Sequence, residues 1–309
     1  MTTLRDAIVL HEVGLRDGLQ MEKQLVPFEQ KVRWAEALLQ SGIDILQLGS
    51  FVHPEKVPQM ADTDRLFSYF SHPGRKPAKV ILSGLVLNEK GLDRGFACGV
   101  DMFCMGVSAS ETHSRKNTGM STDEALSRII PMARDAIDRG KKVQVSVQSA
   151  FGCGFEGLVP LDRVLSIVRK YQEAGLRNIS LADTAGHAHP SQVKQMLNEV
   201  LRPDPELECT CHFHNTYGLG IANCFAAMEW GVRILETSCA GLGGCSFTRV
   251  AAGNVCTEDL VHTLHRMGTR TDIDLKGLLA VAKDLSAFFG REMPGLVYKT
   301  GPVATSLQS

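Results

Sequence analysis

The chain has 309 residues, of which 44% are hydrophobic and 22% are charged, a composition typical of a globular protein that buries a large core. Its formal net charge of -1 argues against a nucleic-acid partner and against an anionic membrane surface. An apolar run near the roughly 18 residues that a membrane span requires is absent from the sequence.

A repeated pattern of amphipathic helix, glycine and short apolar strand runs along the chain. In its first instance Pro27 suits the first turn of a helix, apolar side chains from Phe28 to Leu39 recur on one face, and Gly42 ends the helix. Glycine marks such a joint because it adopts the left-handed conformation that closes a helix. The predicted strands cover residues 8–13, 43–48, 79–85, 100–105, 142–147, 177–181, 207–214 and 232–235.

Strict alternation of strand and helix indicates a parallel sheet, and eight such units in roughly 270 residues fit a closed (β/α)8 TIM barrel. An open doubly wound sheet is the alternative, but the Gly-x-Gly-x-x-Gly of a dinucleotide fold does not follow the first strand. Residues 275–289 predict one extra apolar helix, and a loose tail follows from Gly290. We therefore predict a catalytic barrel over residues 1–270, with a C-terminal helix and tail, 271–309, packed on it.

Active sites of such barrels lie where the strands end and the following loops begin. Polar residues occupy several of these positions, so we expect them to converge on one rim. They are Arg16 and Asp17, Gln47 and Ser50, Gln148 and Ser149, Asp183 and Thr184, His212 and His214, Cys245 in a glycine-rich loop, and Asn254.

The stretch Cys211 to Asn215 reads Cys-His-Phe-His-Asn at the end of a predicted strand. Side chains alternate along a strand, so His212 and His214 share one face and form one edge of a possible metal site. With Asp17 and the side-chain carbonyl of Asn254 they give a mixed oxygen and nitrogen set, which favours Mg²⁺ or Mn²⁺ over Zn²⁺. A zinc cluster that includes the neighbouring cysteines is disfavoured because those thiols face the other way. The alternative without a metal is one satisfied and one exposed histidine.

Arg16 and Cys245 each allow two interpretations. Arg16 either pairs with the adjacent Asp17 at the surface or provides a fixed positive charge for a developing oxyanion or a substrate carboxylate. Cys245 is either a small buried filler or a thiol that a mobile loop delivers to the site.

Several motifs together resemble the hydroxymethylglutaryl-CoA lyase family, whose members share a TIM barrel. They are Glu-Val-Gly-Leu-Arg-Asp-Gly-Leu-Gln at 12–20, Ser-Phe-Val-His-Pro at 50–54, Ser-Leu-Ala-Asp-Thr at 180–184, Cys-His-Phe-His-Asn-Thr-Tyr-Gly at 211–218, Ala-Gly-Leu-Gly-Gly-Cys at 240–245 and Gly-Asn at 253–254. The resemblance implies retro-Claisen cleavage of a 3-hydroxyacyl-CoA to acetyl-CoA and a keto acid.

The resemblance also implies residue roles. Asp17, His212, His214 and Asn254 would hold a divalent cation, Mg²⁺ or Mn²⁺, that lowers the pKa of the substrate hydroxyl. Arg16 would stabilise the oxygen charge that builds during cleavage, and Cys245 would protonate the enolate. Asp183 would support the site, and His212 and Asp17 are both candidate proton acceptors.

The chain departs from the family at positions near the expected acyl group. It has Gln47 where the family has a glutamate, and Ser146 where the family has a tyrosine. With Ser50 these residues are the expected acyl contacts, and the two changes suit an altered acyl group such as citramalyl-CoA. A Claisen-type synthase that condenses acetyl-CoA with a 2-keto acid is another alternative, and a barrel that binds acyl-CoA without turnover is a third.

The remaining expectations concern partners and compartment. Residues 110–117 would bind coenzyme A, with Arg115 or Lys116 near a phosphate, although a solvated loop is nearly as good an interpretation. A homodimer is plausible. The nine scattered cysteines predict reduced thiols, and no signal peptide is visible, so we expect a cytoplasmic protein.

Overall fold

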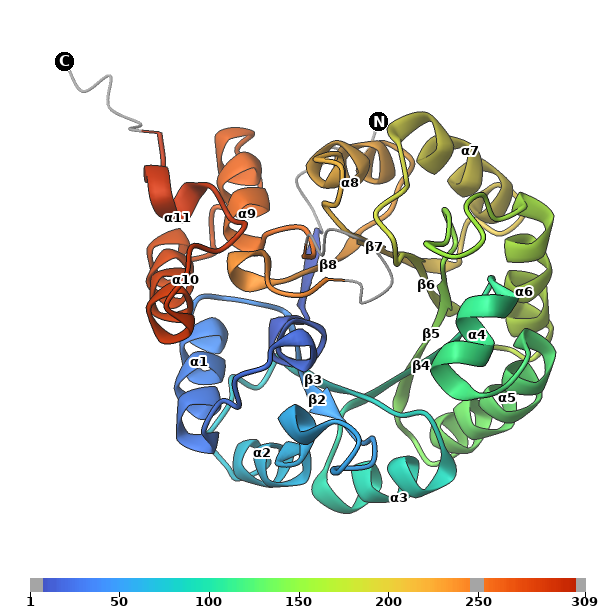
Figure 1. The fold of residues 1–309 in the computed structure, drawn as a ribbon, viewed down its shortest axis with the longest axis horizontal. Coiled ribbons are helices and arrows are strands. Elements are labelled where there is room, and N and C mark those ends of the chain that lie inside the picture. The colour runs from blue at the N-terminus through green and yellow to red at the C-terminus, as the bar shows by residue number, and fades with distance from the viewer. Residues whose placement is uncertain (1–7, 245–252, 304–309) are drawn as a thin grey trace.

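In the computed structural model, which describes residues 8–244 and 253–303, eight parallel strands close into one barrel in chain order. Figure 1 shows the ring of strands inside a ring of helices. The (β/α)8 prediction is therefore confirmed, and the open doubly wound alternative is wrong. The strands are β1 (Val9–Glu12), β2 (Ile45–Ser50), β3 (Ile81–Leu85), β4 (Met102–Ser108), β5 (Lys142–Gln148), β6 (Asn178–Asp183), β7 (Glu208–Phe213) and β8 (Ile234–Thr237).

The strands alternate with helices that cover the outer face of the barrel. The helices are α1 (Phe28–Gln40), α2 (Thr63–Phe70), α3 (Glu89–Cys98), α4 (Glu111–Thr118), α5 (Thr122–Asp138), α6 (Leu161–Glu173), α7 (Pro190–Leu201), α8 (Gly220–Glu229), α9 (Thr257–Arg266), α10 (Leu275–Phe289) and α11 (Val297–Thr300), with short turns η2 (Gly14–Gly18), η3 (Leu19–Met21), η4 (Pro58–Met60) and η5 (Cys239–Gly241). Gly42, predicted to end the first helix, has a positive φ, as a left-handed helix end requires, and so do the glycines at four later helix-to-strand joints: Gly99, Gly140, Gly175 and Gly231.

The barrel has a closed apolar end and a polar end. Ile45, Met102 and Cys104 form a small buried cluster inside the barrel, packed against Val9 and Ile81. Most other buried apolar side chains lie in the main core cluster, to which both the strands and the surrounding helices contribute. The interior above the small cluster carries polar side chains instead of the branched apolar layers usual in these barrels. That polar space, at the carboxyl ends of the strands, is where the candidate site lies.

The C-terminal helices pack against the first helix of the barrel, and Figure 1 shows α10 beside α1. The Trp34 ring of α1 lies edge-on to the Phe288 ring, with 5.3 Å between centroids. The Trp34 indole N–H also donates to Asp284 Oδ2 over 2.6 Å. Beyond Gly290 the structure differs from the predicted loose tail, because Tyr298 of α11 is buried and its hydroxyl accepts a hydrogen bond from the Met293 amide.

Within the described ranges, none of the helices is both long enough and apolar enough to cross a bilayer.

Candidate active site

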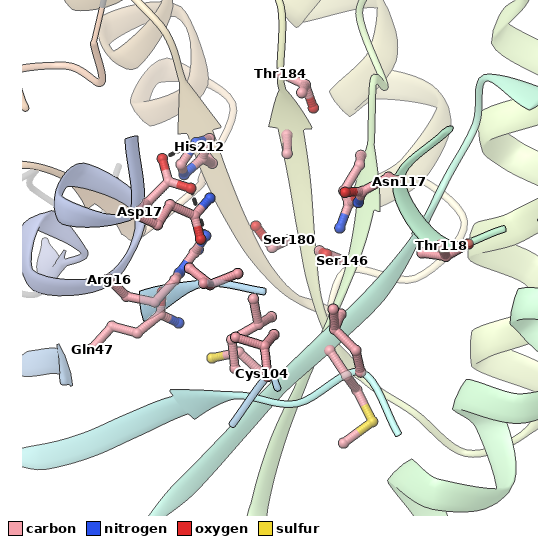
Figure 2. A pocket seen from close by; sticks show the side chains of 18 of the residues that line it. Arg16, Asp17, Gln47, Cys104, Asn117, Thr118, Ser146, Ser180, Thr184 and His212 are labelled. Atoms are coloured by element: carbon pink, nitrogen blue, oxygen red, sulfur yellow. Dashed lines mark hydrogen bonds and ion pairs between the residues drawn. The ribbon is translucent and has the colours of Figure 1, made fainter. Parts of the chain in front are cut away.

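A cavity of about 600 Å³ opens at the carboxyl ends of the barrel strands. Figure 2 shows Arg16, Asp17 and His212 on one side of it, Asn117 and Thr118 on the other, and Ser146 and Ser180 between them. These side chains come from segments far apart in the sequence. The rim position predicted from the strand ends therefore holds for most of the polar residues singled out in the sequence.

Arg16 and Asp17 lie on a single turn of π-helix, η2, directly after β1. Such turns occur frequently at functional sites because they project side chains out of the regular helical pattern. The Arg16 guanidinium donates from Nη1 to Asp17 Oδ1 over 2.5 Å and from Nε to Gln47 Oε1. Both ion-pair side chains are largely buried, at 13% and 14% exposure, so this is no surface pair. The turn thus presents one fixed cation and one fixed carboxylate to the cavity.

Asp17, His212 and His214 form a compact group of potential metal ligands. The Nε2 atoms of the two histidines lie 3.0 Å apart, and Asp17 Oδ2 lies 3.9 Å from His212 Nε2 and 3.7 Å from His214 Nε2. Two neighbouring ligand atoms on an octahedral cation with bonds of roughly 2.1 Å are about 3.0 Å apart. The spacing of the histidine pair and the mixed oxygen and nitrogen chemistry of the group therefore fit a small divalent cation, which these three side chains would hold.

Asn254 joins this group from the segment that follows the glycine-rich loop. A bridge pairs it with His214, and its side-chain amide donates to Asp17 Oδ2 over 2.8 Å and to the Leu242 carbonyl over 3.1 Å. Its Oδ1 atom is buried without a hydrogen-bond partner among the described residues. A buried orphan oxygen beside three potential ligands again fits a cation or its water.

The pKa values of Asp17, His212 and His214 are shifted in different directions. Burial alone would raise the pKa of Asp17, but Arg16 and the two histidines hold it well below its usual range. Burial also opposes charge on His212, yet hydrogen bonding and attraction from Glu236 raise the His212 pKa above its ordinary value. Burial lowers the pKa of His214. Asp17 is therefore ionised at neutral pH, as a ligand carboxylate must be.

The predicted acyl contacts occupy different depths. Gln47 and Ser146 line the cavity, and Gly106 of the neighbouring strand leaves room for Ser146, since a Cβ there would lie 2.1 Å from Ser146 Oγ. Ser50 is fully buried at the end of β2 and is not among the described lining residues.

Asp183 is buried at the end of β6, where its carboxylate accepts hydrogen bonds from the backbone amides of His187 and Ala188 over 2.8 and 3.1 Å. Its carboxylate thus holds the β6 to α7 loop, and its neighbour Thr184 lines the cavity. The structure places Asp183 behind the cavity wall.

Arg115 and Lys116 lie on α4, and neither is among the described residues that line the cavity. Arg115 Nε lies 3.9 Å from Glu111 Oε2, and Lys116 Nζ lies 3.9 Å from the centre of the Phe155 ring. The next residue, Asn117, does line the cavity. Cys245 lies outside the described residues.

Sequence reasoning passed over a carboxylate and a histidine in the barrel centre, Glu236 and His11, and a second buried carboxylate, Glu12, on the opposite face of β1. Glu236 of β8 accepts a hydrogen bond from His212 Nδ1 over 2.8 Å, and His11 of β1 lies beside it. Glu12 accepts the amides of Gly14 and Cys239 and the Thr257 hydroxyl. The available signal was strand alternation, because Glu236 lies two residues from Ile234 and shares its inward face.

Comparison with known proteins identifies the family of this chain. The model of the HMGL-like family matches residues 7–285. The chain belongs to the HMGL-like family. This assignment covers the barrel and most of α10, so the resemblance seen in the motifs is confirmed.

Curated relatives of similar length agree with the assignment. The chain is 36% identical to the hydroxymethylglutaryl-CoA lyase of Pseudomonas mevalonii, over 92% of this chain and 93% of that protein. It is also 36% identical to the (R)-citramalyl-CoA lyase of Chloroflexus aurantiacus, over 96% of each chain. Like these relatives, this HMGL-like protein is a carbon-carbon lyase.

Solved structures of the family share the fold closely. An HMG-CoA lyase from Acinetobacter baumannii in complex with coenzyme A and 3-methylmalate superposes with a TM-score of 0.91 at 36% identity, over 99% of each chain. The Bacillus subtilis HMG-CoA lyase superposes with a TM-score of 0.90 at 33% identity, over 95% of this chain and 97% of that one.

Proposed function

We propose that this HMGL-like lyase cleaves hydroxymethylglutaryl-CoA, or a close 3-hydroxyacyl-CoA relative, to acetyl-CoA and a keto acid. The observation that carries the proposal is the convergence of Asp17, His212 and His214 with the Arg16 guanidinium beside them. The curated relatives named as hydroxymethylglutaryl-CoA lyases, and the neighbour solved with coenzyme A, support an acyl-CoA substrate.

In this proposal Asp17, His212 and His214 hold a divalent cation, Mg²⁺ or Mn²⁺, with Asn254 as a further ligand or as the group that orients Asp17. When bound, the cation draws in the substrate hydroxyl and lowers its pKa. The choice of Mg²⁺ or Mn²⁺ over Zn²⁺ follows from the oxygen ligands and from the lack of a thiolate in the set.

The side chains of the site would then catalyse the retro-Claisen cleavage. The hydroxyl loses its proton to a base, the bond between the second and third acyl carbons breaks, and its electron pair moves onto the thioester as an enolate. Arg16, fixed by Asp17 and Gln47, lies where it would stabilise the negative charge on oxygen. His212 and Asp17 are the candidate bases.

The enolate needs a proton to become acetyl-CoA, and we assign that step to Cys245. Support comes from Gly244, which lines the cavity and directly precedes Cys245 in the chain. Asp183 would support the site by holding the β6 to α7 loop through backbone amides.

A second candidate substrate is citramalyl-CoA, whose carboxylate lies one carbon closer to the reacting centre. Gln47 favours citramalyl-CoA because its side chain is neutral, where the family has a negatively charged glutamate. Gln47 accepts the hydrogen bond from Arg16 Nε without neutralising the guanidinium. Among the described residues, Asp17 is the ionised group paired with Arg16. Arg16 is thereby better able to bind a carboxylate close to the metal ligands. The relative from Chloroflexus aurantiacus supports the same substrate class.

The deciding experiment supplies each thioester separately with Mg²⁺ or Mn²⁺ and identifies the keto acid. Acetoacetate from hydroxymethylglutaryl-CoA is the expected product. Pyruvate from citramalyl-CoA alone would move the assignment to the second candidate. Release of free CoA from acetyl-CoA and a 2-keto acid would instead identify a synthase, and acyl-CoA binding without any turnover would leave a binding protein.

Coenzyme A is the proposed partner, with Asn117 as a contact from the described cavity wall and with Gln47 and Ser146 nearer the acyl group. Ser50, buried behind them, remains a proposed acyl contact. Arg115 and Lys116 remain proposed phosphate contacts at the outer edge of α4. A cytoplasmic location and a homodimer remain proposals that follow from the sequence.

A further inference from the structure

A buried carboxylate lies beneath the candidate metal ligands, in the centre of the barrel. Glu236, on β8, is 6% exposed, and its Oε2 lies 2.8 Å from His212 Nδ1. A carboxylate enclosed in this way destabilises the fold unless hydrogen bonds and charges compensate it. The shortest polar contact of Glu236 is to His212, a candidate metal ligand. This contact suggests what the buried carboxylate does.

The contact decides which nitrogen of His212 is available. An ionised carboxylate only accepts hydrogen bonds, so His212 Nδ1 must carry the proton in the neutral ring, and the lone pair then lies on Nε2. Nε2 is the atom that faces His214 Nε2 at 3.0 Å and Asp17 Oδ2 at 3.9 Å. Glu236 thus selects the tautomer that a cation needs.

His214 provides a contrast within the same site. Its Nδ1 atom is buried without a hydrogen-bond partner among the described residues. The two histidines share one strand face, yet within the described part of the chain only His212 has a carboxylate at its Nδ1 atom. The orientation of the pair is therefore anchored through His212.

Side chains from two further strands, β6 and β1, lie against Glu236. The Ser180 hydroxyl of β6 lies 3.3 Å from Oε1, and His11 Nδ1 of β1 lies 3.6 Å from the same oxygen. His11 is itself held on its far side, because its Nε2 lies 2.7 Å from the Ser83 hydroxyl of β3. At 3.6 Å the His11 contact is longer than a hydrogen bond, so His11 packs beside the carboxylate.

A row of contacting side chains crosses the polar centre of the barrel from β3 to β7. Its members, in order, are Ser83, His11, Glu236 and His212. Each member is buried, so water competes little for these contacts. The orientation of the His212 ring therefore depends on side chains of β3, β1 and β8 as well as on its own strand, β7.

We propose that Glu236 is a positioning residue that fixes the tautomer and ring orientation of His212, and that His11 and Ser180 keep its carboxylate in place. The inference rests on the proposed metal centre and is independent of which acyl group is cleaved. Partners of this kind usually change metal affinity by about 10- to 100-fold when they are removed.

The test compares Mn²⁺ binding to wild type and Glu236→Gln by electron paramagnetic resonance, without substrate. The glutamine amide can donate to His212 Nδ1, which favours the wrong tautomer, so we expect affinity to fall by about 10- to 100-fold. Glu208→Gln, at the exposed amino end of the strand that carries His212, is the matched control and should bind Mn²⁺ as wild type does.

A tautomer readout separates positioning from general damage. Nitrogen-15 spectra of histidine-labelled, metal-free protein should show His212 protonated at Nδ1 in wild type and shifted toward Nε2 protonation in Glu236→Gln. Ser180→Ala, which removes one contact to Glu236 and little volume, should weaken Mn²⁺ binding in the same direction and covers the case in which Glu236→Gln fails to fold.

Unchanged Mn²⁺ affinity in Glu236→Gln and in Ser180→Ala, or an unchanged His212 tautomer in Glu236→Gln, would overturn the proposal. A wild type that binds no Mn²⁺ would overturn it together with the metal centre. A wild type that binds Mn²⁺ but cleaves neither thioester would remove only the proposed function.

Discussion

The side-chain amide of Asn254 donates to Oδ2 of Asp17 over 2.8 Å, joining residues that are 237 positions apart in the sequence. The bond orients the carboxylate whose Oδ2 atom lies 3.9 and 3.7 Å from the Nε2 atoms of His212 and His214. We predict that Asn254→Ala weakens Mn²⁺ binding by about 10- to 100-fold, because Asp17 loses this orientation. Titration calorimetry measures the change, and Asn198→Ala on α7, which removes a solvent-exposed hydrogen bond to Glu199, is the control. Equal affinity in both variants would contradict a role for Asn254.

Arg16 is held by two acceptors, and a lysine cannot reproduce both contacts. We predict that Arg16→Lys keeps the charge but lowers kcat by about 10²- to 10³-fold, since the fork that spans Asp17 and Gln47 is lost. KM should change much less. Steady-state kinetics on the cleaved thioester checks the prediction, and a change confined to KM would show that Arg16 only binds substrate.

Glu12 ties the turn that carries Arg16 to the end of the barrel. Its Oε1 accepts the amides of Gly14 and Cys239 over 2.8 and 3.0 Å, and its Oε2 accepts the Thr257 hydroxyl over 2.5 Å. Glu12→Gln replaces one acceptor with a donor, so we expect a loss of about 1 to 3 kcal/mol in the free energy of unfolding. Urea denaturation measures it. The exposed Glu199→Gln should lose less than about 0.5 kcal/mol.

Burial raises the pKa of Asp183 to about 7 from its ordinary value of 3.8, although the backbone amides of Ala188 and His187 oppose the shift. The unfolded carboxyl releases its proton near pH 4, whereas the folded one keeps it until about pH 7. The unfolded state therefore binds fewer protons in this window, and the free energy of unfolding falls as pH rises from about 4 to 7.

Asp183→Asn removes that contribution and should flatten the slope of stability against pH. Burial also raises the pKa values of Glu12 and Glu258 to about 7, so part of the slope should persist in the variant. Denaturation at pH 5 and pH 8 without metal, compared between wild type and variant, checks the difference. Parallel slopes would show that Asp183 is ionised across this range.

Trp34 connects the barrel to α10 through Phe288 and Asp284. We predict that Trp34→Ala lowers the free energy of unfolding by about 3 to 5 kcal/mol, the range for a buried aromatic side chain. The barrel and the C-terminal helix should unfold together, because they share this contact. Two separate transitions in calorimetry would instead show that residues 271–309 form an independent unit.

The sequence by itself determined the barrel and the convergence of Asp17, His212 and His214. Helical and strand periodicities depend on neighbouring residues in the chain, so each element can be recognised locally. Glycines such as Gly42, with a positive φ, end the helices, and together these signals give the order of the elements. Parallel strands then bring their carboxyl ends to one rim, which is why Asp17 and the two histidines could be matched across the chain.

Only the tertiary structure decided how each polar side chain is used. Asp183 and Glu12 bind backbone amides, whereas Glu236 turns inward to His212, and strand position alone does not distinguish these outcomes. The Arg115 and Lys116 side chains lie away from the cavity because the direction of α4 sets which residue faces it. Such choices depend on contacts between distant strands, which carry no local periodic signal.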